Sequence, residues 1–442
     1  MCFRRAFSLP RGQLANWRTI PQLLRATWEM ADPHQSPHHH IHTRRHMMQT
    51  RKQFLATAAA AASALATASW TPLARAQSKP PIKIGHIAIM TGPASSYGKL
   101  QEVVMKIAVE DINAKGGING SQVVLQTEDS QLDPGQAVLL FRKLMNEGAF
   151  GVIGPMTGTQ WETVSPIANQ LKMPAITVNA SKPGITVRPW TLRLGPADDT
   201  AIPQGFAAFQ KKYPDVKRIA IVADVREASG KAGAEIFEAL ARKNGLQVAE
   251  VIEFSTRATD LSPVAIKVKA LNPDAVFAVA LTPSGILLAK EFAAQGYRKP
   301  VLANSIIWPG SFVNNVGEAG ANWHTIGFST NDESNGDNAL YKTVVQRYVD
   351  RIKDPALGVP ANMANNNIAY DAMLLLVDIL RRNGVDGSTP PAKAREIIMK
   401  EFTQLKTFRG LNTYQMRETG DGDVPHRILT PDVPRKVWKF AD

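Results

Sequence analysis

The stretch that decides the fold runs from residue 82 to residue 127 and reads IKIGHIAIMTGPASSYGKLQEVVMKIAVEDINAKGGINGSQVVLQT. Its first eight residues, 82–89, are mostly apolar, as in a buried strand. After a Thr-Gly-Pro turn, apolar residues recur at the spacing of one helix face from about Tyr97 to Ala114, and two glycines then end the helix. Residues 123–127 are again typical of a strand. The stretch therefore predicts a strand, a helix and a second, parallel strand.

The same alternation continues along the chain. Asp133 followed by Pro134 is typical of a helix start, because the carboxylate can cap free N–H groups and proline fits the first helical position. Strands alternating with helices predict parallel sheets built from right-handed β-α-β units. Further strands are expected at 150–154, 175–178, 219–223, 248–254, 275–280 and 301–303, and further helices at 160–171, 230–243, 261–270, 284–295, 338–352 and 364–382.

An irregular segment, 182–199, contains several prolines and glycines and divides the strands into two comparable sets. We therefore predict an α/β fold with two doubly wound, parallel-sheet lobes. A (β/α)8 barrel is the alternative on strand count alone. The helices at 338–352 and 364–382 come after both sets, which indicates that the chain returns to the first lobe.

Residues 48–76 have the three parts of a secretory signal peptide. Arg51 and Lys52 form the basic start, residues 54–70 the short apolar region, and Ala74-Arg75-Ala76 the cleavage site. The expected location is therefore the periplasm, after cleavage behind Ala76. The residues around Arg51 also resemble a twin-arginine export signal with Lys52 in place of the second arginine, so the export route stays open.

Residues 1–47 are interpreted as an extension upstream of the native start, because a signal peptide belongs at the N-terminus. The histidine-rich tract at 38–42 could bind a metal, but it has no role if residues 1–47 are an upstream extension. Cys2 is the only cysteine and lies in the same segment. A mature chain without cysteine excludes disulfides, zinc–thiolate sites and cysteine nucleophiles.

The formal charge of +13 is concentrated near the N-terminus. Ten of the 51 Lys and Arg residues lie within residues 1–76, and the rest of the chain carries 41 basic and 36 acidic side chains. Such a small excess is that of an ordinary soluble surface and not of a phosphate-binding footprint. A nucleic-acid partner is therefore not expected.

Residues 77–442 offer little reactive chemistry. Their only histidines are His86, His324 and His426, and His86 is expected to be a packed core residue. No nucleophile motif, zinc-protease motif or phosphate-binding glycine loop occurs in a strand–turn–helix context. Two pairs of carboxylates, at 332–333 and at 421 and 423, are expected in solvated turns. We therefore predict no catalytic residue, no metal site, no cofactor and no enzyme activity.

Two loops follow neighbouring strands of the first set, and each precedes a helix or a turn. Residues 153–160 include Thr157, Gly158 and Thr159, and residues 178–182 include Ala180 and Ser181. In open α/β sheets ligands bind beyond the carboxyl ends of the strands, where helix N-termini present free N–H groups. These loops could therefore hold a carboxylate. Plain capping of helices by threonine and serine is the alternative.

Several segments together resemble the periplasmic binding proteins of branched-chain amino acid ABC transporters, which are type I binding proteins. They are IGHIAIMTGP at 84–93, DINAKGGING at 111–120, VIG at 152–154, YDAM at 370–373 and TFRG at 407–410. The resemblance covers about residues 82–440.

This family resemblance implies two lobes joined by a three-stranded hinge that close on a small-molecule ligand. The crossovers are expected near 193–198, 327–332 and 404–409. The N-terminal lobe would comprise 77–195 plus 330–405, and the C-terminal lobe 196–329 plus 406–442. The implied partner is an ABC permease in the inner membrane, and the protein is expected to act as a monomer.

The resemblance also implies ligand-binding positions in the first lobe. Gly158 and Thr159 in one loop, and Ala180 and Ser181 in the other, match the positions that hold the ligand carboxylate. Tyr97 matches an aromatic residue that flanks the ligand.

The second lobe departs from the amino acid binders of this family, which hold the ammonium group with aromatic residues and an acid. Ser229 stands where a tyrosine is usual, Leu281 and Thr282 stand where another is expected, and Ser305 stands close to the place of the acid. An ammonium group without such partners would be poorly compensated for its lost hydration. We therefore expect an aromatic or branched carboxylate that lacks an α-amino group.

Three points about this ligand stay open. Trp308 could form an apolar wall beside Tyr97 and Leu281, or it could be a core residue. Asp224 or Glu227 could supply the missing acid, and the ligand would then be a branched-chain amino acid. An amide or urea ligand in the same fold, a secreted α/β enzyme and a sensing module with a separate partner chain are further alternatives.

Overall fold

The computed structural model describes residues 79–336 and 338–441. The predicted signal peptide, Cys2 and the histidine-rich tract lie outside the described residues. The first sheet has five parallel strands in the order β2-β1-β3-β4-β5. These strands are β1 (Ile82–Ala88), β2 (Val123–Asp129), β3 (Gly151–Ile153), β4 (Ala175–Thr177) and β5 (Thr191–Arg193).

The second sheet has seven strands in the order β15-β14-β10-β9-β8-β6-β7. Its central strands are parallel, whereas β14 runs antiparallel to both β10 and β15. The strands are β6 (Arg218–Asp224), β7 (Gln247–Phe254), β8 (Ala275–Val279), β9 (Val301–Ala303), β10 (Trp323–Gly327), β14 (Arg427–Asp432) and β15 (Val437–Phe440). A small antiparallel sheet contains β11 (Thr407–Arg409), β12 (Thr413–Met416) and β13 (Gly422–Asp423).

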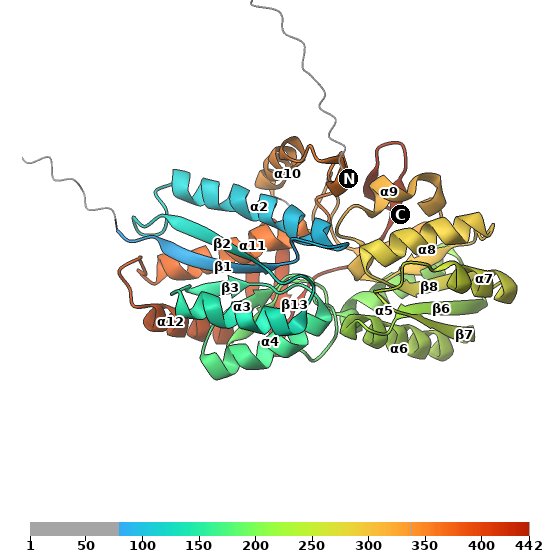
Figure 1. Ribbon diagram of the computed structural model, residues 1–442, viewed down its shortest axis with the longest axis horizontal. Helices are drawn as coiled ribbons and strands as arrows, with labels where there is room; N and C mark the ends of the chain where they lie inside the picture. Colours follow the sequence, from blue (N-terminus) through green and yellow to red (C-terminus); the bar gives the residue numbers. More distant parts are fainter. Residues whose placement is uncertain (1–78, 337, 442) are drawn as a thin grey trace, which may run out of the picture. The chain divides into compact units, whose positions relative to one another are not determined.

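Helices cover the sheets, and the predicted return of the chain to the first sheet is confirmed. α11 packs against α2 and β3, and α10 also packs against α2, while α3 and α4 lie on the other side of this sheet in Figure 1. No helix among the described residues is long and apolar enough to cross a membrane. The α-helices are α2 (Ser95–Ala114), α3 (Pro134–Asn146), α4 (Gly158–Leu171), α5 (Asp198–Lys212), α6 (Ala228–Lys243), α7 (Ser262–Leu271), α8 (Thr282–Ala294), α9 (Phe312–Val316), α10 (Ala339–Arg351), α11 (Asn366–Arg382) and α12 (Pro391–Gln404).

The local signals in the sequence explain where the first elements begin. The isoleucines of β1 at 82, 84 and 87 are fully buried, as expected of a central strand. Asp133 caps α3, because its carboxylate accepts the N–H of Gln136 at 2.7 Å, and Pro134 occupies the first helical position. His86 is fully buried in β1, as predicted, and burial lowers its pKa to about 4.

Two predictions about irregular segments need correction. Residues 182–199 are not irregular throughout, because they contain β5 and the first two residues of α5. The carboxylate of Asp421 is not in a solvated turn: it is 3% exposed and pairs with Arg193 of β5 at 2.9 Å. Burial by itself would raise the pKa of Asp421, but the Arg193 charge holds it below the usual range. Asp332 and Glu333 lie in a partly exposed turn, as expected.

The chain passes between the two sheets three times. It leaves β5 for α5, it returns after β10, and it reaches the second sheet again at β14. Before this last passage, β12 contacts α11, because the Tyr414 hydroxyl donates to Asp371 at 2.7 Å. Two open sheets exclude the barrel alternative. The residue ranges of the two lobes remain a prediction.

Candidate functional site

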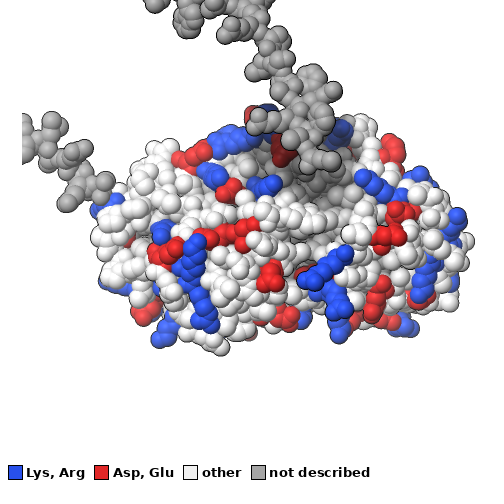
Figure 2. Space-filling model, in the orientation of Figure 1, with Lys and Arg blue, Asp and Glu red and all other residues white. Residues whose placement is uncertain are grey.

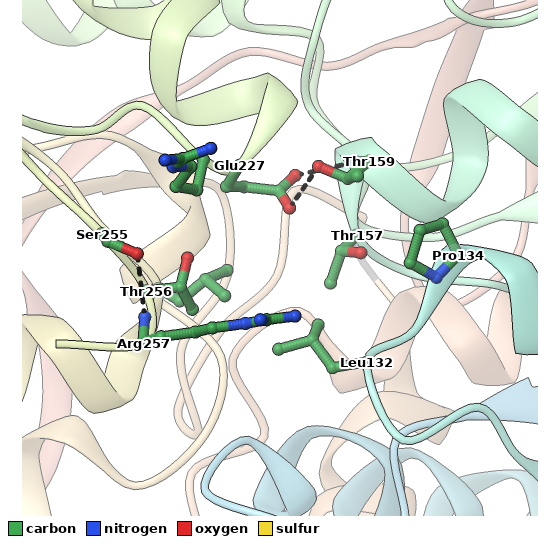
Figure 3. Close-up of a pocket in the computed structure, with 10 residues that line it drawn as sticks. Leu132, Pro134, Thr157, Thr159, Glu227, Ser255, Thr256 and Arg257 are labelled. Atoms are coloured by element: carbon green, nitrogen blue, oxygen red, sulfur yellow. Dashed lines mark hydrogen bonds between the residues drawn. The ribbon is translucent and has the colours of Figure 1, made fainter. Parts of the chain in front are cut away.

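A pocket of about 480 Å³ lies where loops of the two sheets meet (Figure 3). Loops after β2 and β3 form the wall that we call the first-sheet wall, and loops after β6, β7 and β8 form the second-sheet wall. Both walls therefore come from the carboxyl ends of strands, where α/β sheets bind ligands. The lining residues are Leu132, Pro134, Thr157 and Thr159 on the first-sheet wall, and Arg226, Glu227, Ser255, Thr256, Arg257 and Leu281 on the second-sheet wall.

The first-sheet wall is built around the start of α4. Thr157 is the residue before the helix, but its side chain caps no backbone N–H and instead contacts the Gln160 side chain at 3.2 Å. The alternative that Thr157 simply caps the helix is therefore wrong. The free N–H groups of the first helical turn point toward an acceptor from elsewhere.

That acceptor is the carboxylate of Glu227, which comes from the second-sheet wall. The N–H of Thr159 donates to Glu227 Oε1 at 3.0 Å, and the Thr159 hydroxyl donates to Oε2 at 2.9 Å. Glu227 is only 5% exposed, and this burial raises its pKa. The approach is close, because a Cβ at Gly158 would lie 2.6 Å from Glu227 Oε1 and 2.3 Å from Ser229 Oγ.

The second predicted loop lies against the same region of the second sheet. Lys182 N–H donates to Ser229 Oγ at 3.0 Å, and Ala180 is fully buried. The Ser181 hydroxyl donates to Asp198 Oδ2 at 2.8 Å. Burial raises the pKa of Asp198 to about 7, although the Ser181 hydroxyl and the Arg193 charge act against the shift.

Tyr97 and Thr282 form another direct contact between the two sides. The Tyr97 hydroxyl accepts the N–H of Thr282 at 2.6 Å and lies 2.9 Å from the carbonyl oxygen of Ile306. Both residues are nearly fully buried, and burial raises the pKa of Tyr97 well above its ordinary value. This contact lies outside the lining of the pocket described above.

The core alternative for Trp308 agrees with its surroundings. Its indole ring is fully buried, with its centroid 5.0 Å from that of Phe328, and its carbonyl accepts the indole N–H of Trp438 at 3.1 Å. Ser305 is also fully buried, and its hydroxyl has no hydrogen-bond partner among the described residues. The roles of both residues in ligand binding remain predictions.

The structure therefore brings together some of the predicted residues and adds others. Thr159 and Leu281 line the pocket, and Gly158 and Ser229 contact Glu227 or its loop. Tyr97, Thr282, Ala180, Ser181, Ser305 and Trp308 are buried and do not line it. Six lining residues are not among the site residues predicted from the sequence: Leu132, Pro134, Arg226, Ser255, Thr256 and Arg257. Arg226 and Arg257 could have been found, because each follows a predicted strand within three residues.

Charge and metal chemistry add two observations. On the face drawn in Figure 2, basic and acidic side chains are interspersed rather than gathered into one field. Within residues 79–336 and 338–441, no group of three or more His, Cys, Asp or Glu side chains is placed to hold a metal ion.

Comparison with known proteins gives the family. The sequence pattern of the family described as periplasmic binding protein matches residues 81–430. The Leu/Ile/Val-binding protein BraC3 of Rhizobium johnstonii is 30% identical over 369 residues, which cover 81% of this chain and 93% of that protein. The Leu/Ile/Val-binding protein homolog 3 of Brucella melitensis is 26% identical over 351 residues, covering 78% and 89% of the two chains.

Solved structures share the fold. The leucine-binding protein LivK of Thermotoga maritima has a TM-score of 0.71 and 22% identity, with 82% of this chain and 98% of that chain covered. A solute-binding protein of Rhodopseudomonas palustris BisB5, solved with 3,4-dihydroxybenzoic acid, has a TM-score of 0.69 and 19% identity, with 81% and 96% covered. The chain thus belongs to the periplasmic binding protein family and has the type I fold of the leucine-binding proteins.

Proposed function

We propose that this protein captures a small organic acid between its two walls in the periplasm and delivers it to an ABC permease in the inner membrane. The observation that carries the proposal is the carboxylate already bound at the start of α4, that of Glu227. Because these hydrogen-bond donors bind the Glu227 carboxylate, they are suited to bind the carboxylate of a ligand. Capture without chemical change is expected, since members of this family serve transport.

The donors at Thr159 have the properties that a ligand carboxylate needs. A backbone N–H and a hydroxyl converge on two oxygens of one carboxylate. The helix start adds free N–H groups and the positive end of the helix dipole. Glu227 reaches these donors from the opposite wall, so separation of the two walls would free them for a ligand that enters from solvent.

The other lining residues support an acid without an α-amino group. Leu132, Pro134 and Leu281 give the pocket apolar walls. Outside the lining, Ser229 and Thr282 stand where the family resemblance implies aromatic partners for an ammonium group. Structural neighbours from Rhodopseudomonas palustris were solved with benzoate and with 3,4-dihydroxybenzoic acid. An aromatic or branched carboxylate without an α-amino group is therefore the primary candidate.

A branched-chain amino acid is the second candidate, and Glu227 favours it. This carboxylate lies in the pocket, where it could pair with an ammonium group while Thr159 holds the ligand carboxylate. The relatives from Rhizobium johnstonii and Brucella melitensis are named for leucine, isoleucine and valine. Asp224 is a weaker candidate for this role, because its carboxylate is bound by neighbouring N–H groups.

A binding screen on protein that has been unfolded and refolded, to remove carried-over ligand, separates these candidates. The panel sets benzoate, phenylacetate and 2-oxoisocaproate against leucine, isoleucine, valine and simple amides. At 100 times its Kd a ligand adds about 2.7 kcal/mol to the free energy of unfolding, which a melting curve detects. Stabilisation by acids alone supports the proposal, whereas stabilisation by leucine or valine alone overturns it in favour of the second candidate. Recovery of the bound acid unchanged tests the absence of turnover.

The arrangement into lobes belongs to the same proposal. We expect residues 77–195 plus 330–405 to move as one lobe, and 196–329 plus 406–442 as the other, around a hinge of three connecting segments. A monomer is expected. Small-angle scattering with and without the stabilising acid tests both points, since ligand-driven closure reduces the radius of gyration of a monomer.

A further inference from the structure

Two arginines line the pocket from the second-sheet wall. Arg226 follows β6 and Arg257 follows β7, and both side chains are exposed. Figure 3 shows the Arg257 side chain extended across the pocket toward Leu132. Within the part of the chain that the structure describes, neither guanidinium has a hydrogen-bond or ion-pair partner, whereas that of Arg242 on α6 pairs with Glu238 at 2.7 Å.

The backbone that carries both arginines is fixed by one buried acid. Asp224, at the end of β6, is fully buried and in register with Phe254 of β7. Its carboxylate accepts the N–H of Arg226 at 3.2 Å and the N–H of Thr256 at 3.0 Å. Asp224 therefore links the two loops, and the backbone positions of Arg226 and Arg257 are fixed at the same edge of the sheet.

A ligand has to displace an internal competitor. The donors of Thr159 already bind Glu227, which the fold holds near them at high effective concentration. A ligand with a single carboxylate offers these donors the same interaction that Glu227 provides. It therefore needs a further favourable contact elsewhere in the pocket, and guanidinium groups bind carboxylates through strong, paired hydrogen bonds.

We propose that Arg226 and Arg257 form a second anion subsite and that the ligand is a dicarboxylate, with one carboxylate at Thr159 and the other at the two guanidinium groups. This inference rests on the proposed function and narrows its ligand class from organic acids to diacids. Two cations that line one pocket of about 480 Å³ repel each other when it is empty. A second carboxylate removes that repulsion, and a pocket of this volume suits a small ligand.

The test compares diacids with their own monoamides by titration calorimetry on the refolded protein. The matched pairs are terephthalate with 4-carbamoylbenzoate, and glutarate with its monoamide. Wild-type protein should bind at least one diacid at least tenfold more tightly than its monoamide. The double variant Arg226→Gln, Arg257→Gln should lose that preference, with a change of less than threefold for the monoamide. Arg298→Gln, an exposed arginine outside the pocket lining, should change neither affinity.

The outcomes separate this inference from the proposed function. Equal binding of a diacid and its monoamide, binding of benzoate without either diacid, or a double variant that keeps the diacid preference would overturn the second subsite alone. Binding of leucine with no binding of any acid would overturn both. The melting curve of the double variant shows whether the protein remains folded, so that a loss of preference can be assigned to the missing charges.

Discussion

The two walls of the pocket are chemically different. The first-sheet wall offers a backbone N–H, two threonine hydroxyls and the apolar side chains of Leu132 and Pro134, and none of its lining residues is charged. The second-sheet wall carries Arg226, Glu227 and Arg257. Donors at a helix start are fixed by the backbone, whereas charges at loop ends can be exchanged without altering a sheet. Under the proposed function, the first-sheet wall would bind the carboxylate and the second-sheet wall would select among carboxylates.

The largest expected effect comes from filling the space between the walls at Gly158. A Cβ there would lie 2.3 Å from Ser229 Oγ and 2.6 Å from Glu227 Oε1, so Gly158→Ala should hold the walls apart. Overpacking of this kind costs about 1–3 kcal/mol, or roughly 5- to 150-fold in affinity for the stabilising acid. Calorimetry measures the affinity, and small-angle scattering should show a larger radius of gyration in the ligand-free variant.

Gly135→Ala is the matched control for this substitution. It adds the same methyl group to the first turn of α3, where the nearest atom is Asp133 Oδ1 at 3.2 Å. Unchanged affinity in Gly158→Ala would mean that ligand binding does not require the two walls to approach closely at Gly158. The proposal that the two walls act together on one ligand would then be contradicted.

Removing the charge of Glu227 tests whether this residue competes with a ligand carboxylate or pairs with a ligand ammonium group. If Glu227 competes with the ligand carboxylate, Glu227→Gln weakens the internal contact to Thr159, because hydrogen bonds to a charged acceptor are about twice as strong as neutral ones. Affinity for the stabilising acid should then rise roughly tenfold, for a difference of about 1.4 kcal/mol. Calorimetry at pH 7 measures it.

The same variant gives the opposite result for the amino acid alternative. If Glu227 pairs with a ligand ammonium group, affinity for leucine falls by at least tenfold in Glu227→Gln. Glu238→Gln, on α6 and outside the pocket lining, removes a carboxylate that pairs with Arg242, and it should leave both affinities unchanged.

The sequence predicts the first-sheet wall better than the second. The cap at Asp133 and the threonines at the start of α4 are local signals, because these residues follow closely after the end of a strand. The sequence identifies Glu227 only as one of two candidate acids. Its contact with Thr159 joins two loops that are 68 residues apart in the sequence. A local sequence pattern does not predict such a long-range contact.

The same reason explains the missed strand β5. It has only three residues, it follows Pro189, and its Arg193 is a charged side chain that no pattern of buried strands would include. Arg193 can be buried because Asp421, far along the chain, pairs with it at 2.9 Å. Elements with long, periodic patterns, such as β1 and α2, were predicted within two residues of their ends.

A smaller effect is expected from the contact between Tyr97 and Thr282. Tyr97→Phe removes the hydroxyl that accepts the N–H of Thr282 and leaves this buried donor unsatisfied. The cost is about 1 kcal/mol in the closed state, or about fivefold in affinity for the stabilising acid. Tyr213→Phe removes a hydroxyl that contacts His324 at 2.7 Å away from the pocket and should not change this affinity. An equal loss in both variants would show a general effect on folding instead of a contact between the walls.

The last expected effect is on stability instead of affinity, and it concerns the response of the two sheets to acid. His86 lies in the first sheet, whereas His324 lies in β10 and His426 directly precedes β14 of the second, and burial lowers the pKa of each to about 4. The stability that such a histidine contributes is present above the unfolded pKa of 6.5 and is lost as the pH falls toward 4, because the unfolded chain then binds more protons. Each should cost about 2 kcal/mol at pH 5.

With two such histidines against one, the second sheet should lose more amide protection than the first between pH 7 and pH 5, after correction for the intrinsic exchange rate. Hydrogen exchange followed by mass spectrometry measures peptides of each sheet separately. His324→Gln should reduce the difference, since glutamine does not titrate in this range. Greater loss in the first sheet would contradict the assignment of acid sensitivity to these buried rings. In that outcome the second sheet, whose wall carries the charged side chains, would be the sheet that loses less stability at low pH.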